Sequence, residues 1–205
     1  MSFSTPDTQI TGYVVTAANW NELVNNFLAL NGFFRQNLWP DLPALAPASG
    51  ITPAGISIVE SSDAGTAKPL IPIIGFVGTA DEGRMFVCRW PRAYGVSATL
   101  VGSYYMTDAN TSDDAILKCQ LAAVSDGDAS QTAKAFDSVN STTHTVPDAA
   151  GTADEFSITL TNADSIAAID WACVILWRDG DDGSDTANNG DLALTSLAIN
   201  FDIAS

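Results

Sequence analysis

The sequence predicts a mainly β protein: an antiparallel β-sandwich of the jelly-roll type, preceded by a short N-terminal α-helix and a proline-rich linker. Three observations lead to this prediction. Apolar and polar residues alternate with a period of two over most of the chain after residue 55. Of the 24 acidic residues, 20 are Asp, which favours turns and disfavours helix interiors. Helical periodicity is convincing in one stretch, close to the N-terminus.

The helix is predicted over residues 16–36, with Thr16 as its N-cap. Apolar side chains recur there at intervals of three and four residues, the a/d spacing of a short amphipathic stripe. The stripe consists of Trp20, Leu23, Phe27, Leu30 and Phe34. Two heptads are marginal as an isolated helix. We therefore expect the stripe either to pack on its own domain or to contact copies of itself or a partner, and the second alternative makes residues 1–36 an anchor segment.

Residues 37–54 contain four prolines and are predicted to form a semi-rigid, extended linker. Residues 55–205 then form one sandwich domain of roughly eight to ten strands, joined by turns rich in Asp, Gly, Asn and Thr. The stretch at 170–178 is almost wholly apolar, which indicates a central strand covered on both faces. The predicted strands cover residues 55–60, 70–77, 83–90, 98–108, 114–124, 138–146, 155–161, 170–178 and 191–203.

The charge balance disfavours two classes of partner. The chain has 8 Lys plus Arg against 24 Asp plus Glu, a formal net charge of −16. Nucleic-acid binding needs clustered basic residues to neutralise phosphates, and binding to an anionic membrane surface also needs clustered basic residues. No run approaches the roughly 20 apolar residues of a membrane span. Nucleic acid and membrane are therefore not expected as partners. The three cysteines lie in separate apolar runs and are predicted to be buried thiols of a protein made in a reducing cytoplasm.

The acidic loops are the candidates for a metal site. Asp179, Asp181 and Asp185 are spaced like the first half of a calcium loop, but Gly190 stands where the bidentate Glu of an EF-hand would be. A solvated turn is the ordinary interpretation, and a structural Ca²⁺ is the alternative. No other cofactor is expected. His144 has no second His or Cys near it in sequence and no nucleophile motif, so it is interpreted as a strand-face histidine and no enzymatic activity is expected.

Two tryptophans on one predicted strand leave an alternative open. Trp171 and Trp177 are six residues apart, so in a strand both face the same side, together with Cys173 and Ile175. We interpret this face as core. The alternative is a sugar-stacking platform of the kind found in β-sandwich lectins and carbohydrate-binding modules, formed by Trp90, Trp171 and Trp177 with Tyr104 and Tyr105.

Short motifs at both ends of the chain resemble a known group of proteins. The segment TGYVVTAANWNELV at 11–24 resembles the N-termini of tailed-bacteriophage virion proteins of the head-fibre or tail-fibre type. In the second half, YM at 105–106, VSDGD at 124–128, LWRDG at 176–180 and DTA at 185–187 are similar to jelly-roll domains of such proteins.

This resemblance implies a non-catalytic virion structural protein, made in the host cytoplasm and anchored to the particle as a capsid decoration protein or a fibre. A homotrimer is the expected assembly. The implied partners are the protein itself, the major capsid protein or another virion protein, and a host-surface glycan. The alternative function is that of a carbohydrate-binding or receptor-binding, lectin-like module.

Overall fold

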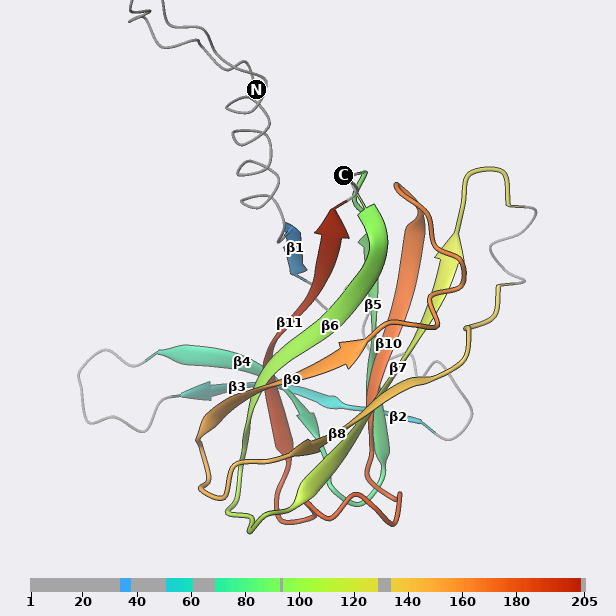
Figure 1. Ribbon diagram of the computed structural model, residues 1–205. Helices are drawn as coiled ribbons and strands as arrows, with labels where there is room; N and C mark the ends of the chain where they lie inside the picture. Colours follow the sequence, from blue (N-terminus) through green and yellow to red (C-terminus); the bar gives the residue numbers. More distant parts are fainter. Residues whose placement is uncertain (1–33, 38–50, 61–68, 93, 129–133, 204–205) are drawn as a thin grey trace, which may run out of the picture.

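The computed structural model describes residues 34–37, 51–60, 69–92, 94–128 and 134–203 (Figure 1). Every regular element in these ranges is a β-strand, and no helix within them is long and apolar enough to cross a bilayer. In chain order the strands are β1 (Phe34–Asn37), β2 (Thr52–Pro53), β3 (Gly55–Glu60), β4 (Leu70–Phe76), β5 (Asp81–Arg89), β6 (Tyr94–Met106), β7 (Asp114–Val124), β8 (Asn140–Thr145), β9 (Ala153–Thr159), β10 (Trp171–Asp179) and β11 (Leu192–Ile203).

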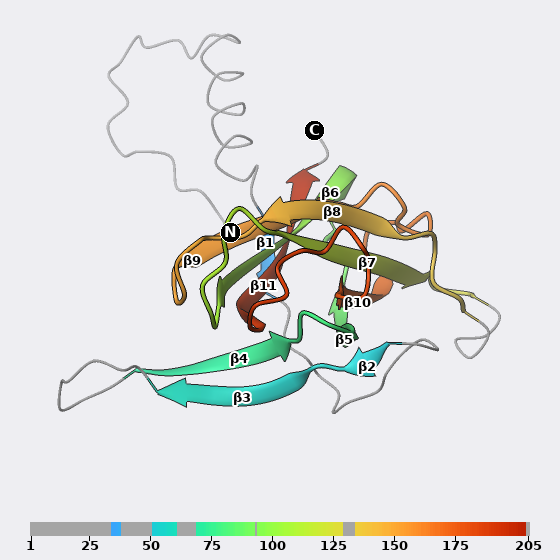
Figure 2. The same ribbon diagram turned by 90° about the horizontal axis from the view of Figure 1, so that it is seen from below.

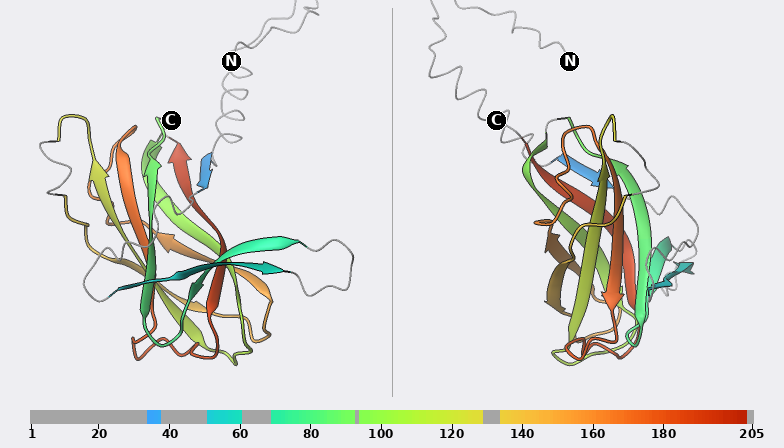
Figure 3. Two further views of the ribbon diagram at one scale, coloured as in Figure 1. Left: turned by 180° about the vertical axis from the view of Figure 1, so that it is seen from behind. Right: turned by 90° about the vertical axis from the view of Figure 1, so that its right-hand side faces the viewer.

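These strands form two sheets packed face to face, as the right-hand view of Figure 3 shows. One sheet has the order β3-β4-β11-β6-β9, with β1 beside β11, and the other has the order β2-β5-β10-β7-β8. Strands β4 to β11 thus supply the quartets β4-β11-β6-β9 and β5-β10-β7-β8, and successive strands change sheet except at the β7–β8 hairpin. This is the connectivity of a jelly roll. The predicted antiparallel sandwich is confirmed, with one parallel pair, β2 with β5.

The core lies between the sheets because alternation along each strand sends every second side chain inward. Phe76, Phe86 and Leu100 are among the fully buried residues there. Phe156 also lies in the core, directly opposite Gly102 of the neighbouring strand. A Cβ atom added at Gly102 would lie 2.3 Å from the Phe156 ring. The Phe156 ring therefore fills the space that a side chain at position 102 of β6 would occupy.

Each of the nine predicted strands corresponds to one of β3 to β11, whereas β2 lies inside the predicted linker at 37–54. Ile51 and Ala54, on either side of β2, are buried at 9% and 0% exposure. Thr52 and Pro53 pair with the edge of β5, which has β10 on its other side. The sandwich therefore begins before residue 55. The unpaired backbone groups at the edge of β5 bind a short segment that has no periodic pattern of its own.

The end of the predicted helix is wrong: residues 34–36 lie in strand β1. Strand β4 pairs with β11 only at Leu192–Leu194, which leaves the rest of that edge of β11 open. Strand β1 pairs there, with Phe34 opposite Phe201. The backbone groups of β11 are satisfied in this way, and this tertiary pairing overrides the local helical spacing. Outside the described residues lie the other members of the predicted anchor stripe, Trp20, Leu23, Phe27 and Leu30.

Strands β3 and β4 form a hairpin that extends beyond the body of the sandwich (Figure 2). Ile56, Ile58 and Leu70 on this hairpin are 53%, 69% and 66% exposed. Cross-strand register places Ile58 opposite Pro72, and Glu60 opposite Leu70. One face of the hairpin therefore presents apolar side chains to solvent. We refer to Gly55–Glu60 together with Leu70–Pro72 as the arm.

Candidate functional site

Strand β10 divides its side chains between the interior and the outer face of its sheet. Ala172, Val174 and Leu176 point inward and are fully buried. Trp171 and Trp177 share the opposite face, as predicted, but this is the outer face and not the core. Both alternating sets of β10 are apolar, so the pattern alone does not decide which set is inside. Trp171 is 52% exposed, and Trp177 only 6%. Trp90 and Tyr104 are not part of a platform, because both are core residues at 1% exposure.

Two side chains from outside the strand account for this difference between the tryptophans. Ile51, next to β2, and Phe136, which precedes β8, pack on Ile175 and Trp177. Because β2 and β8 are at opposite edges of the sheet, these side chains cover its outer face from both sides. The prediction that β10 is a central strand with two covered faces is confirmed for this half. The half that ends at Trp171 stays open.

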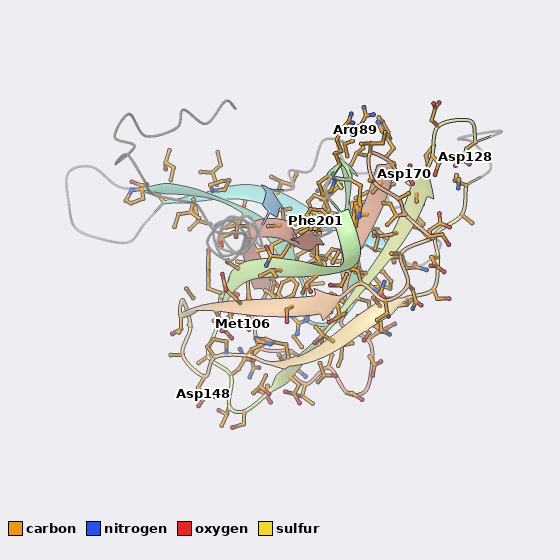
Figure 4. All side chains as sticks on the ribbon, turned by 45° about the horizontal axis from the view of Figure 1, so that its top comes forward. Arg89, Met106, Asp128, Asp148, Asp170 and Phe201 are labelled. Carbon is orange, nitrogen blue, oxygen red and sulfur yellow. The ribbon has the colours of Figure 1, made fainter. Side chains whose placement is uncertain are left out.

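The open half carries a cationic and an apolar neighbour for Trp171. Arg89 of β5 and Val124 of β7 lie directly opposite Trp171 on its two sides. Residues in such positions have Cβ atoms about 4.5–5.5 Å apart, so their side chains are in reach of the indole. Arg89 is exposed and lies at the same end of the sandwich as Asp128 and Asp170 (Figure 4).

The turn before Trp171 is held by a dense set of hydrogen bonds. The Arg89 Nε–H donates to the carbonyl oxygen of Ile169 at 3.2 Å, and the Ile169 N–H donates to the carbonyl oxygen of Trp90 at 3.2 Å. The Asp170 carboxylate accepts from the Ser125 hydroxyl at 2.9 Å. Ile169 has a φ of 69°, a left-handed conformation that is a genuine outlier for a β-branched residue, and it is 45% exposed. Surface residues at this end form what we call the Trp171 patch: Arg89, Val124, Ile169 and Trp171.

The opposite end of β10 carries acidic residues. Asp179 and Asp181 lie together with Asp81, and one carboxylate oxygen from each falls within 4.8 Å of the others. Gly180 makes this approach possible, because a Cβ atom there would lie 2.8 Å from the carbonyl oxygen of Ala80. Sequence reasoning missed Asp81, because it is the first residue of another strand, β5, and is far from Asp179 and Asp181 in the sequence.

This acidic cluster is partly neutralised. Lys118 forms an ion pair with Asp179, and its Nζ lies 3.7 Å from Asp182 Oδ2. Burial, followed by the nearby Asp181 carboxylate, raises the pKa of Asp81 above its usual 3.8. Three carboxylates offer the oxygen ligands that Ca²⁺ prefers. Lys118, however, already engages the carboxylate of Asp179.

Asp185, the third residue of the predicted calcium loop, lies apart from this cluster. Its carboxylate accepts two hydrogen bonds from Arg178, from Nε at 2.9 Å and from Nη2 at 2.7 Å. Both side chains have 0% exposure. The Ile116 N–H also donates to Asp185 at 3.0 Å. The Asp185 carboxylate is therefore buried and already fully engaged by Arg178 and Ile116. Of the three predicted calcium ligands, the structure brings together only Asp179 and Asp181.

His144 lies in strand β8, and its ring links the two sheets. Its Nε2 is 2.9 Å from Asp154 Oδ2, and the Tyr104 hydroxyl donates to the same oxygen at 3.2 Å. Burial alone would raise the pKa of Asp154, but hydrogen bonds from His144, Glu155 and Tyr104 lower it below the usual value. Because β8 and β9 are edge strands of different sheets, this contact fastens one side of the sandwich.

The three cysteines are free thiols. Cys88 and Cys119 are buried, as predicted, and burial raises the pKa of Cys88 to about 12. Cys173 is only half-buried, because it follows Trp171 on the outer face of β10. At neutral pH these groups are protonated thiols and not nucleophiles.

No family model matches the chain, and no curated protein does. Among solved structures, the chain is similar to a xylan-binding module, CBM15, at 14% identity and a TM-score of 0.42, over 85% of this chain and 100% of that chain. It is similar to the CBM22-2 xylan-binding domain from Paenibacillus barcinonensis Xyn10C at 11% identity and a TM-score of 0.40, over 82% of this chain and 98% of that chain.

A further similar structure is the family 11 carbohydrate-binding module from Clostridium thermocellum in complex with a β-1,3-1,4-mixed-linked tetrasaccharide. The identity is 12% and the TM-score 0.37, over 82% of this chain and 97% of that chain.

Proposed function

We propose that this protein is a non-catalytic carbohydrate-binding module, with the Trp171 patch as its binding site. The observation that carries the proposal is the exposed indole of Trp171 on a strand that is paired on both sides. A rigid strand holds an aromatic ring more precisely than a loop does. The outer face of β10 forms the platform, and the hydrogen-bonded turn at Ile169 holds the end of the strand that carries Trp171.

The chemistry of the patch suits a sugar. A pyranose presents C–H groups on its faces and hydroxyls around its rim, and an aromatic ring flanked by polar groups matches both. Neighbouring carboxylates are held in structural contacts: Asp170 accepts from Ser125, and Asp128 lies 3.0 Å from Lys134 Nζ. The proposal accordingly assigns binding, and no bond cleavage, to this site.

Substitution of Trp171 tests the proposal. A Trp side chain buries roughly 200 Å² when covered, so about half of that is left for a ligand and is worth about 2.5 kcal/mol. Trp171→Ala should therefore weaken binding by tenfold to a hundredfold. The assay is a broad glycan array, followed by calorimetry on the strongest hit.

Val139→Ala is the matched control, because Val139 is 42% exposed and lies outside the patch. It should leave binding unchanged, and both variants should keep the wild-type melting temperature. Binding that survives Trp171→Ala, or an array without any hit, would overturn the proposal.

We propose assembly into a phage particle as a second candidate function, because the arm is an exposed apolar edge. Strand β3 is the last strand of its sheet and contains neither Pro nor Lys, two residues that commonly protect edges from pairing. Strands β3 and β4 contain a single charged residue, Glu60, in a chain of net charge −16. Two copies that pair through their arms therefore bring few negative charges together. On a phage particle, residues 1–36 would anchor each copy.

Sedimentation velocity tests this second function. The wild type should self-associate, with the homotrimer as the expected species, and more strongly at high salt because salt screens the repulsion between acidic copies. Ile58→Asp should keep the protein monomeric, whereas Val139→Asp, the control at another exposed apolar position, should not. A wild type that stays monomeric at high salt and high concentration contradicts assembly through the arm.

A further inference from the structure

We propose that the Trp171 patch selects a glycan ending in an acidic sugar, whose carboxylate pairs with Arg89 while its ring stacks on Trp171. This inference rests on the proposed carbohydrate-binding function and adds the chemical class of the ligand. The observations that carry it are the state of Arg89, its register with Trp171 and the charge of the whole chain.

Arg89 is an exposed cation without an acidic partner among the described residues. Lys118, Lys134 and Arg178 each form an ion pair with an aspartate, whereas Arg89 forms none with another described residue. In a chain with three acidic residues for each basic one, an exposed guanidinium without an acidic partner is open to an anionic ligand; Arg92 is a second exposed arginine, but it lies outside the Trp171 patch. It is the kind of group that a carboxylate ligand neutralises.

The hydrogen bond to Ile169 orients this guanidinium. Arg89 Nε–H donates to the Ile169 carbonyl oxygen at 3.2 Å, which fixes one of the five N–H groups and with it the plane of the fork. The other N–H groups are left for a ligand. Because a carboxylate accepts two parallel hydrogen bonds from such a fork, a planar acid fits this site better than a neutral hydroxyl does.

The register places the two recognition groups side by side. Arg89 and Trp171 are directly opposite residues on neighbouring strands, and both point to the outer face. A sugar ring stacked on the indole therefore has its exocyclic substituents beside the guanidinium. A carboxylate attached to that ring reaches Arg89 without leaving the stacking platform.

The net charge restricts the ligand to one acidic sugar at a chain end. The neighbouring Asp170 carboxylate is only 6% exposed and accepts hydrogen bonds from the Ser125 hydroxyl and the Ala167 N–H. At physiological salt the screening length is about 8 Å, so an acid at Arg89 is attracted by this side chain and screened from the more distant aspartates. A polyuronate would extend over the rest of a surface with net charge −16 and be repelled. The favoured ligand is thus a neutral glycan with a terminal uronic or sialic acid.

Calorimetry with two matched ligand series tests the inference. Each series consists of an acidic oligosaccharide, its methyl ester and its neutral parent; one series ends in sialic acid and the other in glucuronic acid. The wild type should bind the acid of at least one series ten times more tightly than the ester, and less tightly as NaCl rises. Arg89→Gln should abolish both this preference and its dependence on NaCl, so that acid and ester bind alike. Arg92→Gln, at a second exposed arginine, should change neither.

The outcomes separate the two proposals. If acid and ester bind equally well in both series and binding still depends on Trp171, the inference is overturned and the carbohydrate-binding function stands. If polygalacturonate or a sulfated parent binds more tightly than the short acids, the terminal carboxylate is overturned. If no saccharide binds, both proposals fall.

Discussion

The two ends of strand β10 use charge in opposite ways. At one end Arg178 and Asp185 form an ion pair with no exposure to solvent, and Asp179 pairs with Lys118 beside it. At the other end Arg89 stands open to solvent next to Trp171. Strand β10 thus has a structural charge network at one end and, at the other, an exposed cation on its neighbour β5.

This difference separates stability from recognition within nine residues of chain. A buried charge is tolerated only with its partner in place, so changes at the Arg178 end should act on the fold. An exposed charge costs little to keep unpaired, so changes at the Trp171 end should act on binding. Substitutions at the two ends of β10 and in the turns beside it test this separation.

Breaking the buried pair should have the largest effect. Arg178→Met leaves the Asp185 carboxylate buried without its partner and should cost about 3–5 kcal/mol of unfolding free energy. The double variant Arg178→Met/Asp185→Leu removes both charges and should recover most of this loss. Urea unfolding of the wild type, the single and the double variant measures it. A single variant as stable as the wild type would contradict a structural role for this end.

Removing one charge from the acidic cluster should have a smaller and opposite effect. The raised pKa of Asp81 means that the fold favours its protonated form, so stability is lost as pH rises from below 3.8 through this raised value. Asp81→Asn stays neutral and should be more stable than the wild type at pH 7 by about 1 kcal/mol, a gain of roughly 2–4 °C in Tm. At pH 3 the two proteins should melt alike.

Calcium provides the companion measurement for this cluster. If Asp81, Asp179 and Asp181 hold a cation, Ca²⁺ should raise the Tm of the wild type and leave that of Asp81→Asn unchanged, and a chelator should reverse the rise. Equal melting of the wild type with Ca²⁺ and with chelator would show that repulsion in the cluster is relieved by Lys118 and by protonation alone.

The smallest effect is expected at the strained turn. Ile169→Gly removes a left-handed β-branched residue, whose conformation costs about 1–2 kcal/mol, and adds the entropic cost of glycine, about 0.5–1 kcal/mol. The net gain should be about 1 kcal/mol or less. Because the carbonyl that orients Arg89 is kept, ligand affinity should change less than it does in Trp171→Ala. A destabilised Ile169→Gly protein would mean that the exposed Ile side chain contributes packing.

The sequence predicted most of the sandwich because a strand with one buried face leaves a period of two. The stretches at 55–60 and 114–124 coincide with β3 and β7 to the residue. Strands β1 and β2 left no such pattern: they are short, and they pair with edges of β11 and β5 that other parts of the chain leave open. Residues 34–36 were accordingly predicted as helix.

The candidate sites show the same division. Local spacing correctly grouped Asp179 with Asp181, and Trp171 with Trp177, because neighbours along one loop or one strand stay neighbours in the fold. Asp81 joins the first pair from another strand, a proximity that Gly180 permits and that sequence distance hides. Asp185 lies apart from this pair, because its carboxylate forms an ion pair with Arg178. A buried guanidinium without such a partner would strongly destabilise the fold.

By itself, then, the sequence determined the fold class, the succession of strands along the chain and which residues of each strand share a face. These features follow from local alternation and turn chemistry. Tertiary structure alone decided which face of β10 is interior. Both sets of its side chains are apolar, and the second sheet packs against the set that contains Ala172 and Val174. Ile51 and Phe136, distant in sequence, then cover Trp177 and leave Trp171 in solvent. Whether an apolar side chain belongs to a core or to a binding surface depends on what packs against it, and that contact is made only in the folded chain.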